Sequence, residues 1–182
     1  PRRCNAQRTP TEGFGACRMG TLPVVARAAR HDWEEPCLSG TRGSGTVFFC
    51  GCALGCVYCQ NAPISRGALT GKTLSPKDLA MLFERVEALG VHNLNLVSPS
   101  HFAPAVLEAL RIYKPQIPVV WNSSGYESVE VIQAARGLVD IYLPDFKYYK
   151  ASTAAQLSAA PDYLPVALAA IQAMCRQTGA PA

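Results

Sequence analysis

After residue 45 the hydrophobic residues alternate between two arrangements, one typical of strands and one typical of helices. Short apolar runs typical of buried strands are separated by longer segments whose apolar side chains recur at helical spacing. The apolar runs predict strands over 46–50, 93–97, 117–121 and 139–143. The other segments predict helices over 76–89, 104–113, 128–135 and 151–178, the last in two pieces broken near Pro161. This alternation predicts an α/β fold of βα units, with parallel strands and helices on one or both faces.

The first predicted helix has clear boundary signals. Ser75 is a suitable N-cap, Pro76 occupies the first helical position, and Asp78 lies in the first turn. Gly90 follows the last apolar position and is expected to end the helix. Residues 70–75 before it are expected to form a connector.

Residues 1–45 show no clear periodicity and are rich in Arg, Gly, Pro and Cys. We expect an irregular leader over 1–45 and an α/β domain over 46–182 that supplies about four βα units. Four leader residues could either touch a substrate or brace the leader, and we favour bracing: His31, Trp33, Glu34 and Glu35. Because the chain starts at a proline and ends within a helical pattern, we expect a fragment that lacks more at its C-terminus than at its N-terminus.

Composition and charge narrow the class of protein. The chain has 182 residues, of which 49% are hydrophobic and 16% charged, as is typical of a globular domain. Its net charge of +4 is mild and its basic residues are scattered, so no nucleic-acid partner is expected. No apolar run approaches the roughly 18 residues of a membrane span, and no signal peptide is visible. We therefore expect a cytoplasmic protein without a membrane partner.

Eight cysteines are many for a chain of this length. A chain with this many core residues does not need disulfides, so reduced thiols and metal binding are expected. Three cysteines form the run CALGCVYC directly after the first predicted strand: Cys52, Cys56 and Cys59. This spacing suits three irons of a four-iron cluster and leaves the fourth iron open to a ligand. A zinc site is the alternative, but zinc prefers four ligands.

The remaining cysteines have other expected roles. Cys50 ends the first predicted strand and is expected to be a small buried side chain, and Cys175 is expected to lie in the core. Two interpretations stay open for Cys4, Cys17 and Cys37 of the leader. They could form a second metal site that organises the leader, or they could be unpaired thiols.

Polar residues also follow the other predicted strands. They are Ser98, Ser100 and His101 after the second, Asn122 and Ser123 after the third, and Asp145 and Lys147 after the fourth. In a βα barrel the carboxyl ends of the strands meet at one rim, which carries the functional residues. We therefore expect these residues to converge with the cysteines. A packed or capping imidazole is the alternative for His101, and a solvated ion pair is the alternative for the last two residues.

The cysteine run resembles the CxxxCxΦC signature of radical SAM enzymes, with Tyr58 as the aromatic residue. Further segments resemble the pyruvate formate-lyase activating enzyme-like branch of that superfamily and together cover nearly the whole chain. They are HDWEEPCLSG, GSGTVFFCGC, CQNAPIS, NLNLVSPSHF, WNSSGYE and DIYLPDFKYY. The resemblance implies a partial (β/α)6 barrel of the radical SAM type, here truncated at the C-terminus.

The resemblance also implies roles for residues of the predicted site. The three cysteines would ligate a [4Fe-4S] cluster, and its open iron would bind S-adenosylmethionine (SAM). Tyr58 would present its ring to the bound nucleotide, and Asp145 and Lys147 match a DxK pattern close to it.

Two further groups are placed by the resemblance. Ser98, Ser100 and His101 occupy the position of a GGE motif that binds the methionine amino group in many relatives, and they would substitute for it. Asn122 and Ser123 stand where activating enzymes carry an aspartate and a threonine near a monovalent cation. The neutral Asn122 removes the charge that such a cation would need.

These expectations combine into a hypothesis for the reaction. A radical SAM enzyme would cleave SAM reductively to a 5′-deoxyadenosyl radical, which abstracts hydrogen from a substrate, a protein glycine being one candidate. A flavodoxin or ferredoxin would supply the electron. The alternative is an iron–sulfur electron carrier or a zinc-organised binding domain without SAM chemistry. An electron carrier would need a fourth cysteine, for which Cys50 or Cys37 are the candidates.

Overall fold

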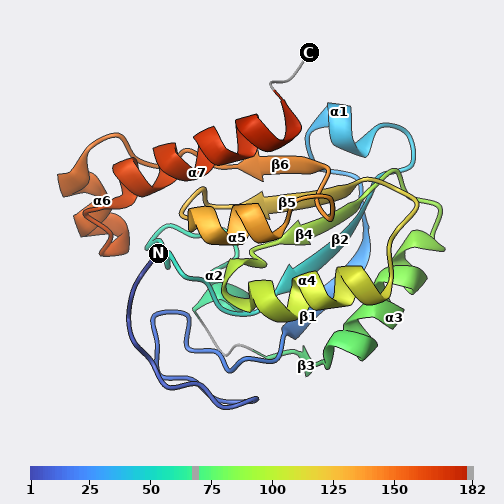
Figure 1. Cartoon of the computed structure of the whole chain (residues 1–182), viewed down its shortest axis with the longest axis horizontal. Coiled ribbons are helices and arrows are strands. Elements are labelled where there is room, and N and C mark those ends of the chain that lie inside the picture. Colours follow the sequence, from blue (N-terminus) through green and yellow to red (C-terminus); the bar gives the residue numbers. More distant parts are fainter. Residues whose placement is uncertain (67–69, 180–182) are drawn as a thin grey trace.

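The structure is a computed structural model that describes residues 1–66 and 70–179 (Figure 1). At its centre lies a six-stranded mixed sheet with the strand order β3-β1-β2-β4-β5-β6. Helices connect the successive strands of the parallel part, so the predicted α/β class is confirmed. No helix within the two described ranges is long and apolar enough to cross a membrane.

Four strands make up the parallel part and stand side by side in chain order. They are β2 (Ser44–Phe49), β4 (Leu94–Val97), β5 (Val119–Ser123) and β6 (Ile141–Pro144). Each corresponds to a predicted strand. β5 starts later than predicted and continues to Ser123, so Asn122 and Ser123 are the last residues of the strand rather than part of the following loop.

The main helices occur where they were predicted. They are α3 (Pro76–Glu87), α4 (Ala103–Ile112), α5 (Val129–Ala134), α6 (Ala151–Ser158) and α7 (Tyr163–Thr178). The expected break near Pro161 is confirmed, because it falls between α6 and α7. In Figure 1, α4 and α5 lie over the same face of the sheet, and α7 packs against α5 and the edge strand β6. Shorter turns are α1 (Pro36–Ser39), α2 (Ala62–Ser65) and the 3-10 turn η1 (Ser100–Phe102).

The start of α3 follows the predicted capping chemistry. Ser75 is the N-cap, and its hydroxyl accepts a hydrogen bond from the Asp78 backbone N–H at 3.1 Å. This bond satisfies one of the backbone donors that a helix start leaves free. Leu79 and Phe83 are completely buried against the sheet, as the apolar spacing predicted.

The leader is not irregular throughout, and that prediction was wrong for two of its segments, β1 (Val24–His31) and the turn α1. β1 pairs antiparallel with β2, and β3 (Lys72–Thr73), within the predicted connector, pairs with the beginning of β1. The sheet is therefore mixed rather than wholly parallel. Apart from Val24 and Val25, β1 consists of alanines, arginines and a histidine, which favour strands weakly. Its conformation depends on hydrogen bonds to β2, which a local pattern cannot reveal.

The two faces of the sheet have different chemistry. Leu96 and Trp121 belong to the apolar core beneath the helices. Thr46 of β2 stands opposite Asn95 of β4 on the other face, and both are completely buried. Because successive side chains of a strand alternate between faces, this polar face leads along the strands toward Asn122 near the end of β5. The face away from the helices is thus where polar chemistry collects.

Candidate metal centre and cofactor cavity

A cavity of about 650 Å³ opens at the carboxyl ends of the parallel strands. Its walls come from the loop after β2, the ends of β4, β5 and β6, and the leader segment 31–35. Nine of the eleven residues predicted for the site line it: Cys52, Cys56, Tyr58, Cys59, Ser98, Asn122, Ser123, Asp145 and Lys147. Residues that are distant in the sequence therefore share one chamber.

The cysteine loop between β2 and α2 starts with a sharp turn at Gly51. Its φ of +79° lies in the left-handed region that favours glycine. A Cβ at this position would stand 2.3 Å from Met19 Cγ and 2.8 Å from the Cys17 carbonyl oxygen. The leader therefore presses directly against the base of the loop, and only a glycine fits between them.

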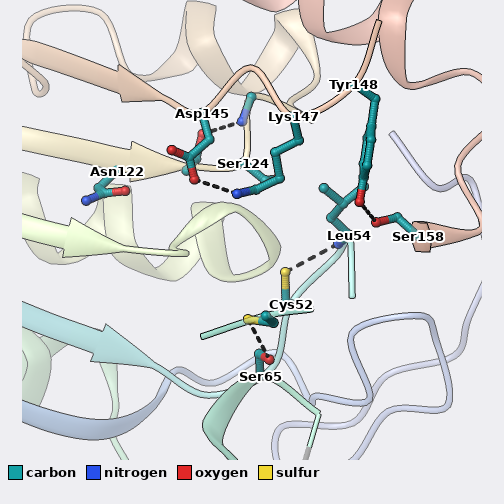
Figure 2. A network of polar contacts seen from close by, with 12 residues as sticks. Cys52, Leu54, Ser65, Asn122, Ser124, Asp145, Lys147, Tyr148 and Ser158 are labelled. Atoms are coloured by element: carbon teal, nitrogen blue, oxygen red, sulfur yellow. Dashed lines mark hydrogen bonds and ion pairs between the residues drawn. The ribbon is translucent and has the colours of Figure 1, made fainter. Parts of the chain in front are cut away.

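Two of the thiols accept hydrogen bonds from the loop and its flank (Figure 2). The Leu54 backbone N–H donates to Cys52 Sγ at 3.4 Å, and the Ser65 hydroxyl donates to Cys59 Sγ at 3.3 Å. Cys56 is buried, whereas Cys52 and Cys59 are half-buried. Hydrogen bonds to sulfur are one of the factors that set the reduction potential of protein-bound iron–sulfur clusters.

The electrostatics of the loop oppose ionisation of the Cys52 thiol. Burial raises the pKa of the Cys52 thiol, the backbone N–H groups of Gly55 and Leu54 lower it, and Cys56 and Cys59 raise it further. The three thiols thus lie close enough to oppose one another's ionisation. A positively charged metal centre would offset both the burial and this repulsion, since thiols bind metals as thiolates.

Two kinds of metal centre place different demands on three cysteines. Within the described residues, no group of three or more His, Cys, Asp or Glu side chains is arranged to hold a metal ion. Thiolates on one zinc ion, each about 2.3 Å from the metal, stand within roughly 4 Å of one another. A four-iron cluster bonds each thiolate to a different iron and therefore spreads them further apart. The three cysteines line one cavity but form no single-ion site within the described residues.

An ion pair lies on the wall opposite the cysteine loop (Figure 2). Lys147 Nζ stands 2.7 Å from Asp145 Oδ2. Burial lowers the pKa of Lys147, but the ion pair with Asp145 outweighs it and raises that pKa above its ordinary value. The ammonium side chain is 24% exposed and the carboxylate 63%, so the pair offers both charges to the cavity rather than to the core.

Tyr163 of α7 holds the two loops behind this ion pair. Its buried hydroxyl lies 2.8 Å from the Ser124 and Asp145 carbonyl oxygens and accepts a hydrogen bond from the Lys147 backbone N–H at 2.8 Å. The hydroxyl therefore joins the segments after β5 and β6 to α7. Sequence reasoning missed this residue, because a tyrosine in a helix looks like any other core position.

The aromatic residue of the cysteine motif stands at the mouth of the cavity. Tyr58 is 50% exposed, and its ring meets the ring of Tyr148 edge to face with centroids 6.2 Å apart. Tyr148 is itself buried, and its hydroxyl is 2.6 Å from the Ser158 hydroxyl at the end of α6. Tyr58 therefore has a fixed support on one side and an open face on the other.

The loop after β4 contributes less than predicted. Ser98 lines the cavity, and its φ of +58° is a strained conformation for a serine. Ser100 and His101 do not line it. The Ser100 hydroxyl donates to Glu127, and His101 Nε2 bonds the Cys50 carbonyl oxygen at 2.7 Å. The side chains of these two predicted cofactor ligands thus bond to the protein itself. His101 is a packed imidazole, which was the alternative expected from the sequence.

Glu127 is the other residue that sequence reasoning missed. This carboxylate is only 2% exposed and accepts hydrogen bonds from Ser100 and from Trp121 Nε1, the latter at 3.3 Å, while the Ser123 hydroxyl stabilises its charged form. Burial nevertheless raises the pKa of Glu127. Glu127 is the last residue of the segment WNSSGYE, but no local pattern showed that its carboxylate joins the loop after β4 to the end of β5.

The leader reaches the cavity as well. Asn122 Nδ2 donates to Glu34 Oε2 at 3.1 Å, and the Glu34 backbone N–H donates to the Ser39 hydroxyl at 3.1 Å. Glu34 thus braces the leader against β5, in agreement with the favoured interpretation. His31 and Trp33 line the cavity beside it, and Trp33 is 88% exposed at its mouth.

The remaining cysteines lie outside the cavity lining. Cys50 is completely buried, as predicted, and its Sγ is 3.4 Å from the Thr70 carbonyl oxygen. Cys175 was expected in the core, but it is exposed, because it lies on the solvent side of α7. Cys4 and Cys37 are exposed and Cys17 is half-buried, with no metal-binding arrangement in the part of the chain described here.

Comparison with known proteins identifies a relative of this chain. No family model matches the chain. It is similar to the uncharacterized protein MJ0674 of Methanocaldococcus jannaschii, with 35% identity over 173 residues. The alignment covers 90% of this chain and 49% of the relative, so the chain spans about half the length of the protein it matches.

Proposed function

We propose that this chain carries the cluster and nucleotide site of a radical SAM enzyme. The observation that carries the proposal is the cavity itself, in which the three cysteines of a C-x3-C-x2-C loop face the polar ends of three further parallel strands. The spacing of the cysteines along the chain and their position around one cavity both suit a four-iron cluster with one open iron.

Cys52, Cys56 and Cys59 would hold the [4Fe-4S] cluster. Such a cluster supplies one electron to the sulfonium of SAM, which gives methionine and a 5′-deoxyadenosyl radical. No other cysteine lines the cavity among the residues described. The electron-carrier alternative needs a fourth cysteine, and Cys50 is turned toward Thr70 instead, while Cys37 lies exposed in α1. This arrangement favours an open iron over a closed cluster.

The remaining residues of the cavity would bind and orient SAM. An amino acid group is a zwitterion, and Asp145 and Lys147 offer the two complementary charges 2.7 Å apart. The Ser98 hydroxyl has no protein hydrogen bond in the described part of the chain, so it is free to bind a ligand. The half-exposed ring of Tyr58 would stack on the adenine. Asn122 is already bonded to Glu34, so its role would be to shape the wall.

The same proposal extends to the fold and the partners. Parallel strands that stand side by side in chain order are typical of a βα barrel segment, whereas a doubly wound sheet reverses its order. We therefore propose a partial (β/α)6 barrel preceded by the leader. The reaction needs a one-electron donor such as a flavodoxin or ferredoxin, SAM, and a substrate of which a protein glycine is one candidate. Reduced thiols in the cysteine loop suit a cytoplasmic protein.

Anaerobic reconstitution tests the proposal. The chain is loaded with iron and sulfide, reduced with photoreduced 5-deazariboflavin and mixed with SAM. The expected result is 5′-deoxyadenosine, together with a change in the electron paramagnetic resonance of the reduced cluster on adding SAM. An intact cluster that gives neither would overturn the proposal. One equivalent of zinc with no bound iron would instead support the zinc-organised domain.

A further inference from the structure

The cysteine loop forms the wall between two cavities. A second cavity, of about 490 Å³, lies on its outer side, away from the predicted nucleotide site. It is bounded by the loop itself, the leader, the end of α2 and the end of α6. Cys52 is the only cysteine of the loop that lines both cavities in the described structure. We call the outer cavity the arginine cavity, because Arg2, Arg18 and Arg66 line it.

The described lining of the arginine cavity carries net positive charge. No Asp or Glu is among its described lining residues. Arg2 donates to the carbonyl oxygens of Ala53 and Leu54, each at 2.7 Å, and Arg66 donates to the Val57 carbonyl oxygen at 3.0 Å. Carbonyl groups accept hydrogen bonds from the guanidinium groups but leave their net charge in place. The outer face of the loop is therefore basic close to Cys52.

The surroundings of this cavity suit a transient protein contact. Val57, an apolar residue of the loop, is 55% exposed at its edge. Arg18 is exposed and donates to the Arg66 carbonyl oxygen, so its charge lies at the surface and its position is held. Complexes of electron-transfer proteins are small and rely on complementary charge to bring the partners together quickly.

We propose that an acidic one-electron carrier protein docks on the arginine cavity and delivers its electron on the Cys52 side of the loop. This inference rests on the proposed function, because reductive cleavage of SAM consumes one electron. The reduced carrier loses that electron, and the electron finally breaks one carbon–sulfur bond of the sulfonium to give methionine and the 5′-deoxyadenosyl radical. A protein cannot enter the inner cavity, which SAM and substrate would fill, so the outer face is the short route.

The test measures binding separately from catalysis. A purified flavodoxin, oxidised so that no electron moves, is titrated against the full chain as purified, first at about 10 mM salt and then at about 200 mM, where exposed charges are screened. Arg18→Glu reverses an exposed charge and Arg66→Gln removes one while keeping a hydrogen-bond donor for Val57. Arg85→Glu, an exposed arginine of α3 on a different cavity, is the matched control.

We expect R18E to weaken flavodoxin binding about 10-fold at low salt and R66Q to weaken it about 3-fold, since rim charges act mainly through long-range attraction. R85E should bind like the unmutated chain, and all differences should shrink at high salt. No binding at low salt, or equal effects of R18E and R85E, would overturn the docking proposal.

Reduction of the reconstituted chain provides the second readout. In stopped flow, reduced flavodoxin should bleach the cluster about 10-fold more slowly in R18E, whereas uncharged photoreduced 5-deazariboflavin should reduce both proteins at the same rate. Equal slowing by both reductants would mean that the variant damages the loop, and would overturn the proposal. If deazariboflavin reduces the cluster but no SAM is cleaved, the proposed function fails while the binding result still decides the docking surface.

Discussion

The cysteine loop over 52–59 and the loop over 98–101 both follow parallel strands, and both were predicted to bind cofactor. Their polar groups differ in whether they face a cavity or bond to the protein. The cysteine loop presents its thiols to a cavity, and the Cys52 and Cys59 thiols accept long hydrogen bonds. In the second loop, Ser100 and His101 are held by a buried carboxylate and a buried carbonyl oxygen.

The difference shows that position at a strand end does not by itself make a residue functional. Buried polar groups require partners, and the partners decide whether a side chain remains available to a ligand. Within the described residues the Ser98 hydroxyl has no hydrogen-bond partner in the protein, while the nearby Ser100 hydroxyl donates to Glu127. One loop is thus free to bind cofactor, and the other is mainly a structural brace.

Replacing a cysteine of the loop should have the largest effect. Cys56→Ala removes one thiolate ligand of the proposed cluster, so iron content should fall sharply and SAM cleavage should drop about 100-fold or more. Cys50→Ala, a buried thiol outside the cavity, is the matched control and should keep its iron. Iron and sulfide analysis, together with measurement of 5′-deoxyadenosine, tests whether Cys56 is a ligand. Full iron loading in C56A would contradict that assignment.

Removing the brace should cost folding stability. Glu127→Ala leaves the buried donors of Ser100, Trp121 and Ser123 without an acceptor, and we expect a loss of about 3 kcal/mol in the free energy of unfolding. Glu127→Gln keeps one acceptor oxygen and should lose about 1 kcal/mol. Urea denaturation of the two variants measures both. If they are equally stable, the carboxylate does not hold the loop.

His101 should make stability depend on pH. Burial lowers the pKa of His101 from 6.5 to about 4, although its bond to the Cys50 carbonyl oxygen opposes this. The unfolded chain therefore binds the proton first, so stability is complete above about pH 6.5 and falls as the pH drops toward 4, by about 3 kcal/mol from this group. Urea denaturation between pH 4 and 7 should show this slope. His101→Gln should flatten it, and an unchanged slope in that variant would rule out His101 as the source.

The two serines of the second loop allow the finest comparison. Ser98→Ala should change stability by less than about 0.5 kcal/mol but weaken SAM binding about 5-fold, because one hydrogen bond to ligand is lost. Ser100→Ala should do the reverse, losing about 1 kcal/mol of stability with SAM affinity unchanged within about twofold. Equilibrium binding of SAM to the reconstituted chain, with parallel denaturation curves, separates the two. Equal losses of affinity would remove the distinction between binding and bracing.

Much of the fold was predictable because its signals are local. The apolar runs placed β2, β4, β5 and β6, and helical spacing placed the main helices, with Ser75 as the N-cap of α3. β1 was missed because its pairing with β2, and not its own alanines and arginines, makes it a strand. Cys175 was misplaced because helical spacing alone did not show which side of α7 faces solvent.

The sequence by itself determined the βα alternation and the three-thiol motif, because hydrophobic period and ligand spacing are properties of neighbouring residues. It also indicated which strand ends carry polar groups. Only the tertiary structure decided which of those groups are free, since the choice between Ser98 and Ser100 depends on Glu127, which lies on a different loop. It alone placed Arg2 and Arg66 on one side of Cys52 and Lys147 on the other. Contacts between distant segments depend on how the strands pack, and no local pattern encodes them.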